Sequence, residues 1–227
     1  ELKNPLTSLR SACETLPLAR TEESQKRLVE IIRHDVARTD RLISDISAAS
    51  RLDAELSRSQ DALVDLGALL DAVVKVQEEL AGRRGQVVVL SVDEAGGPLV
   101  VRGSDTRLGE VFTNLLDNAR SFTPDGGRIE VTAYRRADFA EIRVEDEGPG
   151  IKDDMTERIF ERFYTDRDDA AAFGNNSGLG LSICRQIVQA YGGMIFAENR
   201  YTTSLGPERR VLGARFVVQL PLAGAAA

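Results

Sequence analysis

The sequence is poor in residues that bind metals or form cross-links. Its 227 residues include no tryptophan, one histidine and two cysteines, and only 5% are aromatic. Cys13, Cys184 and His34 give no ligand spacing for zinc, which argues against a zinc site. We expect both cysteines to be reduced thiols packed in apolar patterns, as in a cytoplasmic protein. We expect His34 to be a solvated surface residue, because it falls off the apolar stripe of its predicted helix.

Long hydrophobic runs and an excess of positive charge are also missing. No apolar segment approaches the roughly 20 residues that a membrane-spanning helix needs. The formal net charge is −7, so nucleic acid is not an expected partner. The chain begins without methionine and without a signal peptide, and we therefore expect an excised fragment. What is present is a hydrophobic content of 42%, enough for a substantial core.

Two amphipathic helices are predicted at the start of the chain, over residues 1–52. The second runs from Glu22 to about Leu52. The first carries apolar residues at alternating steps of four and three, the spacing of a heptad seam: Leu2, Leu6, Leu9, Cys13 and Leu16. Two such helices joined by a short turn predict a helical hairpin. Its apolar faces can be covered by a second copy of the chain or by the neighbouring domain.

A polar linker is predicted at residues 53–63, and the pattern then changes to short strands and helices. Helical spacing recurs at 69–80, from Asp105 and at 180–191. Strand patterns fall at 64–66, 87–92, 99–101, 128–135, 139–145, 194–197 and 214–220, and 128–135 is expected to pair antiparallel with 139–145. The order predicts a mixed α/β sandwich over 64–222, not a doubly wound fold. Residues 223–227 are expected to be a disordered tail.

The helix that begins near Asp105 carries a row of polar side chains. Glu110, Asn114 and Asn118 are spaced by four residues and therefore lie on one side of the helix. One carboxylate and two amide oxygens can hold a hard cation such as Mg²⁺. A solvent-facing polar stripe has the same pattern, and this helix alone does not separate the two interpretations.

A glycine-rich turn follows the strand at 139–145. Asp146 stands at the strand end, where its carboxylate can accept a hydrogen bond from an amino group. Gly148 and Gly150 flank a proline and let the backbone approach a planar ligand closely. Taken alone, the segment 146–151 is equally consistent with an ordinary turn.

Four further segments at loop positions carry candidate ligand-binding features. Arg162 lies among three aromatic residues and can pair with phosphate. Residues 174–181 run into a helix start, where backbone N–H groups form a natural phosphate site, although the pattern is not a Walker A loop. The small, polar stretch 165–173 suits a mobile lid. Arg120 and Phe122, just beyond Asn118, are candidates for a phosphate contact and a base contact.

The order and spacing of these segments resemble the ATP-binding domain of two-component sensor histidine kinases, in which the matching segments are the N, G1, F and G2 boxes. Residues 1–6, Glu-Leu-Lys-Asn-Pro-Leu, resemble the H box of the same family. The Asn-Ala-Arg-Ser-Phe variant at 118–122 suggests its ChvG-type branch. The resemblance implies an α+β protein: an antiparallel helical hairpin, half of a dimeric four-helix bundle, followed by an α/β sandwich of the Bergerat (GHKL) type.

The resemblance also implies ATP and Mg²⁺ as cofactors and assigns roles to individual residues. The metal ligands are Asn114 and Glu110. The nucleotide contacts are Asn118, Arg120, Phe122, Asp146, Gly148, Gly150, Ile151, Arg162, Ser177, Gly178, Leu179, Gly180 and Leu181. The catalytic positions are Glu1 as general base, Asn4 as the residue that orients water for dephosphorylating the regulator, and Glu110. The family often has Lys where this chain has Ser121, which leaves open whether Arg120 takes over that phosphate contact.

The implied function is transfer of the γ-phosphoryl group of ATP to a histidine and then to an aspartate of a response regulator, with possible regulator phosphatase activity. The acceptor position falls immediately before Glu1, so we expect this chain to bind ATP without phosphorylating itself. The implied partners are a second copy of the chain and a receiver domain, with no nucleic acid and no membrane contact by this fragment. The implied location is the cytoplasmic portion of an inner-membrane sensor. Two alternatives stay open: a GHKL ATPase that drives a clamp, and a nucleotide-binding pseudokinase or dimerisation module.

Overall fold

The computed structural model describes most of the chain: residues 3–19, 21–33, 35–36, 39, 62–152, 154–162, 164, 178–202 and 210–224. It divides into two compact units, which are treated separately below. The first unit comprises residues 1–55 and 162–180, and the second comprises residues 56–161 and 181–227. Several predictions concern positions outside the described residues, namely those on Glu1, His34, the second helix at 40–52, Ser177, the lid at 165–173, the tail at 225–227 and most of the linker.

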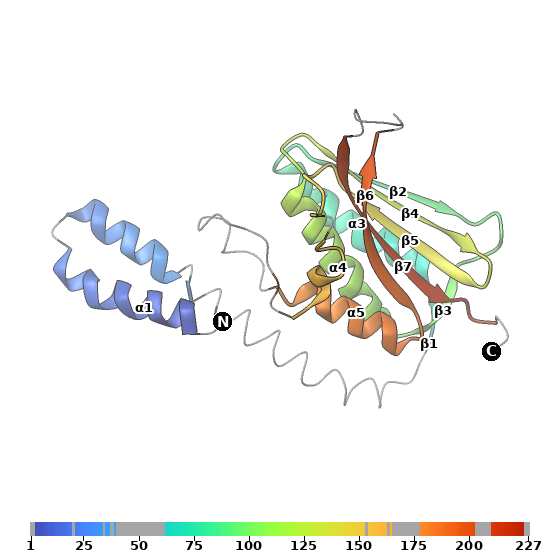
Figure 1. Ribbon diagram of the computed structural model, residues 1–227, viewed down its shortest axis with the longest axis horizontal. Helices are drawn as coiled ribbons and strands as arrows, with labels where there is room; N and C mark the ends of the chain where they lie inside the picture. The colour runs from blue at the N-terminus through green and yellow to red at the C-terminus, as the bar shows by residue number, and fades with distance from the viewer. Residues whose placement is uncertain are drawn as a thin grey trace. The chain divides into compact units, whose positions relative to one another are not determined.

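The first unit contains the start of the predicted hairpin. Helix α1 spans Lys3–Thr15 and is followed by the short 3₁₀ helix η1, Leu16–Leu18. A second helix covers 22–33, and Figure 1 shows it beside α1. The Thr21 hydroxyl accepts a hydrogen bond from the Ser24 N–H at 3.2 Å, which caps this helix. Cys13 is exposed on α1 in the single chain, so the prediction that it is a packed thiol is wrong there.

The second unit contains seven strands and three α-helices among the described residues. In chain order they are β1 (Ala62–Asp65), α3 (Leu66–Gly82), β2 (Val87–Asp93), β3 (Val100–Gly103), α4 (Asp105–Phe122), β4 (Arg128–Arg136), β5 (Phe139–Glu145), the 3₁₀ helix η2 (Arg158–Phe160), α5 (Gly180–Ala190), β6 (Met194–Tyr201) and β7 (Val211–Pro221). Every element predicted for this unit is present, with shifted ends: Leu66 begins α3 and does not end a strand, Leu99 precedes β3, and β6 and β7 are longer than predicted.

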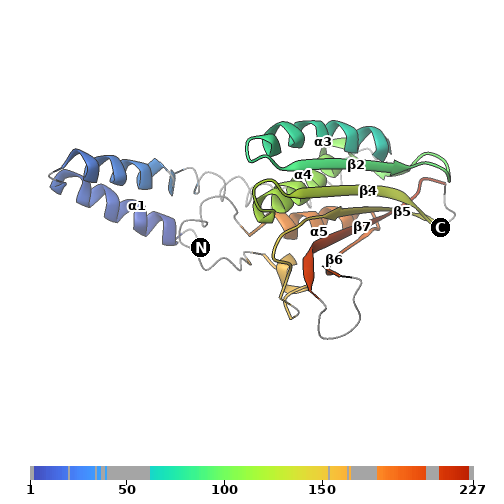
Figure 2. The same ribbon diagram turned by 90° about the horizontal axis from the view of Figure 1, so that it is seen from above.

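Five of the strands form one sheet in the order β2-β4-β5-β7-β6, which Figure 2 shows from above. The β4–β5, β5–β7 and β6–β7 pairs are antiparallel, whereas β2 and β4 are parallel. The remaining strands, β1 and β3, pair antiparallel as a separate two-stranded sheet. The predicted antiparallel pairing of 128–135 with 139–145 is therefore confirmed, and so is the mixed α/β sandwich.

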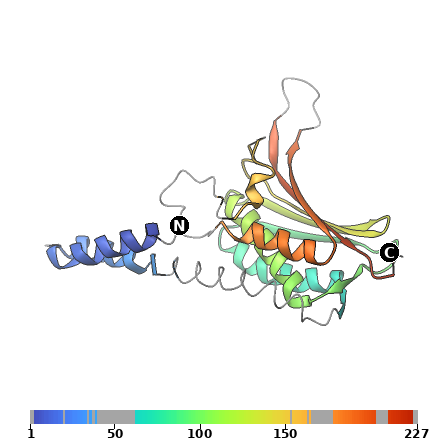
Figure 3. The ribbon, with the colours of Figure 1, turned by 60° about the horizontal axis from the view of Figure 1, so that its bottom comes forward.

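The core of the second unit lies between the sheet and the helices, which cover one of its faces (Figure 3). One face of α4 supplies six fully buried side chains: Leu108, Val111, Phe112, Leu115, Leu116 and Ala119. Each has no exposed surface, so this apolar stripe fixes the rotation of α4 about its axis. The opposite rows of the helix, including Glu110, Asn114 and Asn118, are left half-buried.

The other face of the sheet carries charged side chains that pair with one another. Glu141 on β5 has no exposed side-chain surface and accepts hydrogen bonds from four neighbours: Tyr134, Arg136, Arg143 and Gln219. Burial, the largest single influence, raises the pKa of Glu141, but these hydrogen bonds outweigh it and hold the pKa at about 2. The cluster therefore stabilises the sheet, and its charges are already neutralised within the unit.

Candidate nucleotide-binding site

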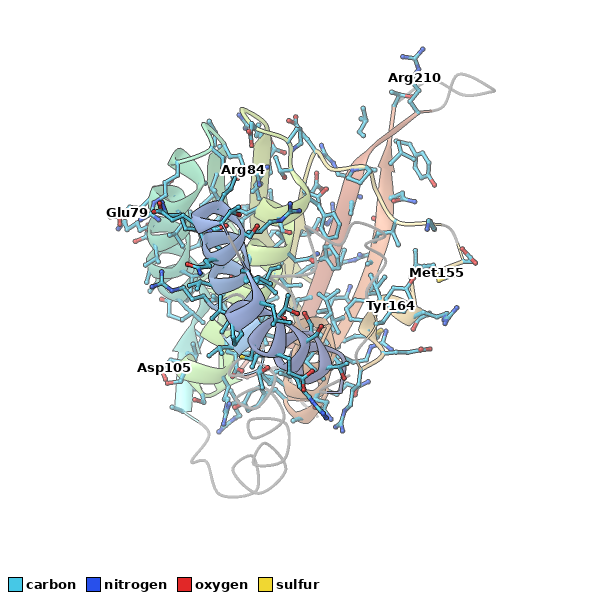
Figure 4. The ribbon with its side chains drawn as sticks, turned by 90° about the vertical axis from the view of Figure 1, so that its left-hand side faces the viewer. Glu79, Arg84, Asp105, Met155, Tyr164 and Arg210 are labelled. Carbon is cyan, nitrogen blue, oxygen red and sulfur yellow. The ribbon has the colours of Figure 1, made fainter. Side chains whose placement is uncertain are left out.

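The first part of the candidate site is the polar row on α4. The Ser104 hydroxyl accepts a hydrogen bond from the Arg107 N–H at the start of this helix, and Asp105 lies in its first turn. Figure 4 shows Asp105 at the opposite end of the helical layer from Arg84, which follows α3. Because α4 is helical from Asp105 to Phe122, Glu110, Asn114 and Asn118 share one side of it, as predicted.

The three side chains of this row are held to different degrees. The Glu110 Oε2 atom lies 2.9 Å from Arg107 Nη1, one turn earlier on the helix. The Asn114 side chain hydrogen-bonds the Cys184 thiol of α5, which is fully buried. Asn118 has no hydrogen-bond partner among the described residues. The row therefore retains amide oxygens and one carboxylate oxygen, Glu110 Oε1, that no other described residue is seen to use.

The donor set of the row fits Mg²⁺ better than a metal held entirely by protein. Among the described residues, no group of three histidine, cysteine, aspartate or glutamate side chains lies close enough to hold a metal ion. Mg²⁺ is commonly bound through one or two carboxylates together with phosphate oxygens and water. One carboxylate and two amide oxygens meet that requirement only if a phosphate-bearing ligand completes the coordination.

The second part of the site is the turn at residues 146–151, which we call the base turn. Asp146 is only 2% exposed. Its Oδ1 atom accepts hydrogen bonds from the Gly148 N–H at 2.8 Å and the Ala214 N–H at 3.0 Å. Neither bond uses Oδ2, which has no partner among the described residues. The remaining oxygen of this largely buried carboxylate is a suitable acceptor for a ligand amino group.

The environment of Asp146 affects its ionisation in two opposing ways. Burial raises the pKa of this carboxyl, and the backbone N–H groups of Ala214 and Gly148 offset part of that rise. The net effect is a pKa above the ordinary value of 3.8. A donor from a ligand would favour the charged form and would thus relieve part of the cost of burying the carboxylate.

The base turn is attached to the β6–β7 hairpin at both ends. At its start, Arg200 Nη1 donates to the Asp146 carbonyl at 2.9 Å, and a Cβ on Gly213 would lie 1.8 Å from the same oxygen. At its end, Asn199 of β6 forms hydrogen bonds to both the N–H and the C=O of Ile151. The strands therefore hold the turn without any ligand.

The glycines of the base turn are required by the protein itself. Gly150 has a φ of +81°, and a Cβ there would lie 2.4 Å from Val211 Cγ1. A Cβ on Gly148 would lie 2.9 Å from Asp146 Oδ1 and 3.1 Å from the Cβ of Phe122. Phe122 thus lies against the base turn, and its side chain is 38% exposed, which leaves part of its ring for a ligand.

Arg120 lies differently from the predicted phosphate contact. Its Nη1 atom donates to Gln77 Oε1 of α3 at 2.9 Å and lies 3.6 Å from Asp117 Oδ1. Its carbonyl accepts from Arg84 and Gln86. Arg120 is therefore engaged where α3 meets α4, on the opposite side of α4 from Asn118. This geometry gives the predicted phosphate contact no support.

Of the remaining predicted residues that the structure describes, five belong to the first unit and one to the second. In the first unit, Arg162 is exposed, Leu179 is buried, and Gly178 and Gly180 are half-buried. In the second unit, Leu181 is half-buried in the first turn of α5. Asn4 lies in α1. The assignments of these residues to nucleotide or water remain predictions.

Four residues around the site had not been predicted: Cys184, Asn199, Arg200 and Gly213. Each acts on a predicted residue across a gap of 48 to 70 positions, as the Asn199–Ile151 pair shows with its separation of 48. No local periodicity marks such long-range contacts. Only the interruption of the β6 pattern by the polar segment Glu198-Asn199-Arg200 was a visible signal.

Comparison with known proteins places this chain in a family. The model of "Histidine kinase-, DNA gyrase B-, and HSP90-like ATPase" matches residues 103–224, more than half of the chain. The model of "His Kinase A (phospho-acceptor) domain" matches residues 1–55. The chain belongs to the family of histidine kinase-, DNA gyrase B- and HSP90-like ATPases. It contains, among its described residues, no helix that is long and apolar enough to cross a membrane.

Two curated relatives are similar along nearly the whole chain. Sensor protein ChvG of Rhizobium meliloti is 54% identical over 97% of this chain, and Sensor protein ChvG of Agrobacterium fabrum is 52% identical over 98%. The predicted likeness to the ChvG-type branch of sensor histidine kinases is thus confirmed. The chain spans 38% of the length of each of these relatives.

Solved structures agree with this placement. The catalytic domain of histidine kinase ThkA matches 72% of this chain and 97% of its own, with 28% identity and a TM-score of 0.61. The structure of ThkA in complex with response regulator protein TrrA matches 98% of this chain and 59% of its own, with 25% identity and a TM-score of 0.72. The predicted GHKL fold is confirmed.

Proposed function

We propose that this chain is the ATP-binding and phosphotransfer core of a protein-histidine kinase, which passes the γ-phosphoryl group of ATP to a histidine and then to a response-regulator aspartate. The observation that carries ATP binding is the free Oδ2 atom of the buried Asp146, which offers an acceptor to the adenine amino group. Phe122 offers a ring beside it. The two ChvG sensor proteins and the match of residues 1–55 to the phospho-acceptor domain support the histidine kinase activity.

In this proposal the polar row of α4 receives the phosphates together with Mg²⁺. Asn114 and Glu110 would hold the ion, and Asn118 would support them, while the ion would neutralise phosphate charge. Glu110 would have to exchange or share its ion pair with Arg107. Arg162 and the backbone of residues 177–181 are proposed to contact the phosphates, since a glycine-rich helix start provides free N–H groups.

The proposed chemistry depends mainly on positioning. A neutral imidazole attacks the γ-phosphorus in line and ADP leaves, so alignment and charge neutralisation supply most of the rate. Glu1 is proposed to accept the imidazole proton, and Asn4 to orient the water that later dephosphorylates the regulator. Through this role of Asn4, the chain is proposed to act also as a phosphatase of the regulator.

The helical hairpin is proposed to join two copies of the chain and to receive the regulator. Apolar side chains on its surface support pairing: Leu18, Val29, Ile31 and Val36 are all more than one-third exposed in the single chain. The complex of ThkA with its regulator TrrA supports a receiver domain as the partner. By similarity to the sensor relatives, the location is proposed to be the cytoplasmic part of an inner-membrane sensor. The proposed domains are 1–52 for the hairpin and 64–222 for ATP binding, with 53–63 as linker.

The experiment that tests this function uses a longer version of the protein that includes the residue before Glu1. Incubation with γ-labelled ATP and Mg²⁺ should give an acid-labile phosphoprotein, the property of phosphohistidine. The label should then pass to a purified receiver domain. Hydrolysis of ATP without labelled protein would favour the clamp-type ATPase instead, and absence of ATP binding would favour a dimerisation module.

A further inference from the structure

We propose that Asn199 is a positioning residue for the base turn, whose side-chain amide holds the Gly150–Ile151 end in the conformation that receives adenine. This proposal rests on the proposed ATP binding. It adds a residue of β6 that neither the motifs of the turn nor the polar row of α4 contain.

The Asn199 side chain hydrogen-bonds the backbone of Ile151 twice. Its Oδ1 atom accepts from the Ile151 N–H at 2.7 Å, and its Nδ2 atom donates to the Ile151 C=O at 2.6 Å. One side chain thus satisfies both backbone groups of one residue, as a neighbouring strand would. Asn199 therefore supplies the two hydrogen-bond partners that a neighbouring strand would give Ile151.

Gly150 is closely surrounded by side chains of β6 and β7. A Cβ on this residue would lie 2.7 Å from Asn199 Oδ1 and 2.4 Å from Val211 Cγ1. The φ of +81° at Gly150 is also one that other residues rarely adopt. The end of the turn is therefore held by steric contact as well as by hydrogen bonds, and a small change at Asn199 alters both.

Different side chains and backbone groups hold the two ends of the base turn. The bonds that Asp146 accepts from the N–H groups of Gly148 and Ala214 do not involve the Asn199 side chain. Removing Asn199 should loosen the Ile151 end and leave the Asp146 carboxylate in place. Base discrimination should survive, because Asp146 accepts from the amino group of adenine and repels the carbonyl oxygen that guanine presents there. Affinity should fall, because the looser turn must be ordered on binding.

The test compares Asn199→Ala with the unaltered chain and with Glu198→Ala as a matched control. Glu198 is adjacent on β6, and its carboxylate pairs with Arg215 on the outer face of the sheet. The probes are ADP and GDP without Mg²⁺, titrated by calorimetry well below the unfolding temperature. We expect Asn199→Ala to weaken ADP binding about fivefold to tenfold and to keep the ADP-to-GDP ratio within about twofold. Glu198→Ala should change neither.

A second readout follows the turn directly. Hydrogen exchange of the Ile151 amide should be faster in Asn199→Ala than in Glu198→Ala, because its acceptor is gone. Asn199→Asp retains that acceptor but cannot donate to the Ile151 carbonyl. It should therefore protect the amide and bind ADP with intermediate affinity, and it carries the test if Asn199→Ala does not fold.

Three results would overturn the proposal. They are unchanged ADP affinity in Asn199→Ala, unchanged protection of the Ile151 amide, and loss of discrimination between ADP and GDP. A purely structural role would lower the unfolding temperature without changing affinity in the folded protein. If the unaltered chain binds no ADP, the proposed function fails, whereas the exchange of Ile151 still reports whether Asn199 holds the turn.

Discussion

The two ends of the candidate site differ in how firmly the protein holds them. At the base end, Asp146 and Ile151 are both fixed by hydrogen bonds from β6, β7 or the turn itself. At the phosphate end, Glu110 has one ion pair, Asn114 bonds one buried thiol, and Asn118 has no partner among the described residues. The protein alone therefore organises the base end of the proposed site, and we expect the phosphate end to depend on the ligand and on Mg²⁺.

This difference has an energetic consequence. A preorganised contact spends little of its binding free energy on ordering the protein, so single contacts at the base end should have large effects. At the proposed phosphate end, several oxygen atoms and water molecules contribute together to the binding free energy. Substitutions there should give smaller changes in affinity, and those changes should depend on Mg²⁺.

The largest effect is expected at Asp146. Asp146→Asn retains an acceptor for Gly148 and Ala214 but turns an amide N–H₂ group toward the adenine amino group. ATP affinity should fall roughly 10- to 100-fold, since a hydrogen bond to a charged group contributes about 1.5–3 kcal/mol. Calorimetric titration measures the loss. Glu130→Gln is the control, because it removes one charge where Glu130 pairs with Arg128; equal losses in both variants would contradict the base-end assignment.

The next effect is expected at Asn114. Asn114→Ala should lose roughly tenfold of the ATP affinity measured with Mg²⁺, because a proposed metal ligand is removed. Affinity without Mg²⁺ should change little, because the substitution leaves the base turn intact. Paired titrations with Mg²⁺ and with EDTA measure this difference. Asn118→Ala should show a smaller loss of the same kind. A variant that binds Mg²⁺-ATP like the unaltered protein would remove Asn114 from the metal site.

Substitution of Arg120 distinguishes a role in fold stability from a role in nucleotide binding. Arg120→Ala removes the donor to Gln77 and the partner of Asp117, so the free energy of unfolding should fall by about 1–2 kcal/mol. Nucleotide affinity should remain within about twofold. Denaturant unfolding and calorimetry test the two parts. A large loss of affinity in the folded variant would restore the phosphate contact that the sequence suggests.

The smallest effect is expected from pH. Because burial raises the pKa of Asp146, lowering the pH protonates this carboxyl before an ordinary one, and the protonated form no longer offers a charged acceptor. Adenosine affinity should therefore fall a few-fold as the pH drops toward that raised pKa. Adenosine is used because it has no phosphate that titrates. Asp146→Asn should bind adenosine without this pH dependence, and an identical dependence in the variant would assign the titration elsewhere.

The raised pKa of Asp146 also makes the stability of the fold depend on pH. A carboxyl with a raised pKa in the folded state binds protons more readily there than in the unfolded chain. Asp146 should therefore make folding less favourable as the pH rises from the ordinary value of 3.8 through its raised pKa, with a constant cost above that range. Bound adenine should reduce that cost.

The contrast between the two ends also explains what the sequence can predict. The polar row on α4 follows from a four-residue spacing, and Asp146 follows from its place after an alternating strand, so both are local signals. The parallel pairing of β2 with β4 and the Asn199–Ile151 contact join segments far apart in the chain, and no periodicity records them. Arg120 was assigned to phosphate by its position after Asn118, although two residues further along a helix lie on the opposite side.

Strand lengths show a similar limit. β6 continues to Tyr201, although its run of apolar residues ends at Ala197. Glu198, Asn199 and Arg200 remain in the ladder because β7 provides hydrogen-bond partners for their backbone. Their side chains then serve the sheet face and the base turn, which hydrophobic patterning cannot indicate.

The most direct test of a preformed base end and a metal-dependent phosphate end is one set of calorimetric titrations on the unaltered chain. Adenosine and ATP are each titrated with Mg²⁺ and with EDTA. We expect adenosine to bind equally well in both conditions and Mg²⁺ to strengthen only the binding of ATP. Adenosine binding that requires Mg²⁺, or ATP binding that is unchanged by it, would show that the two ends do not differ in this way.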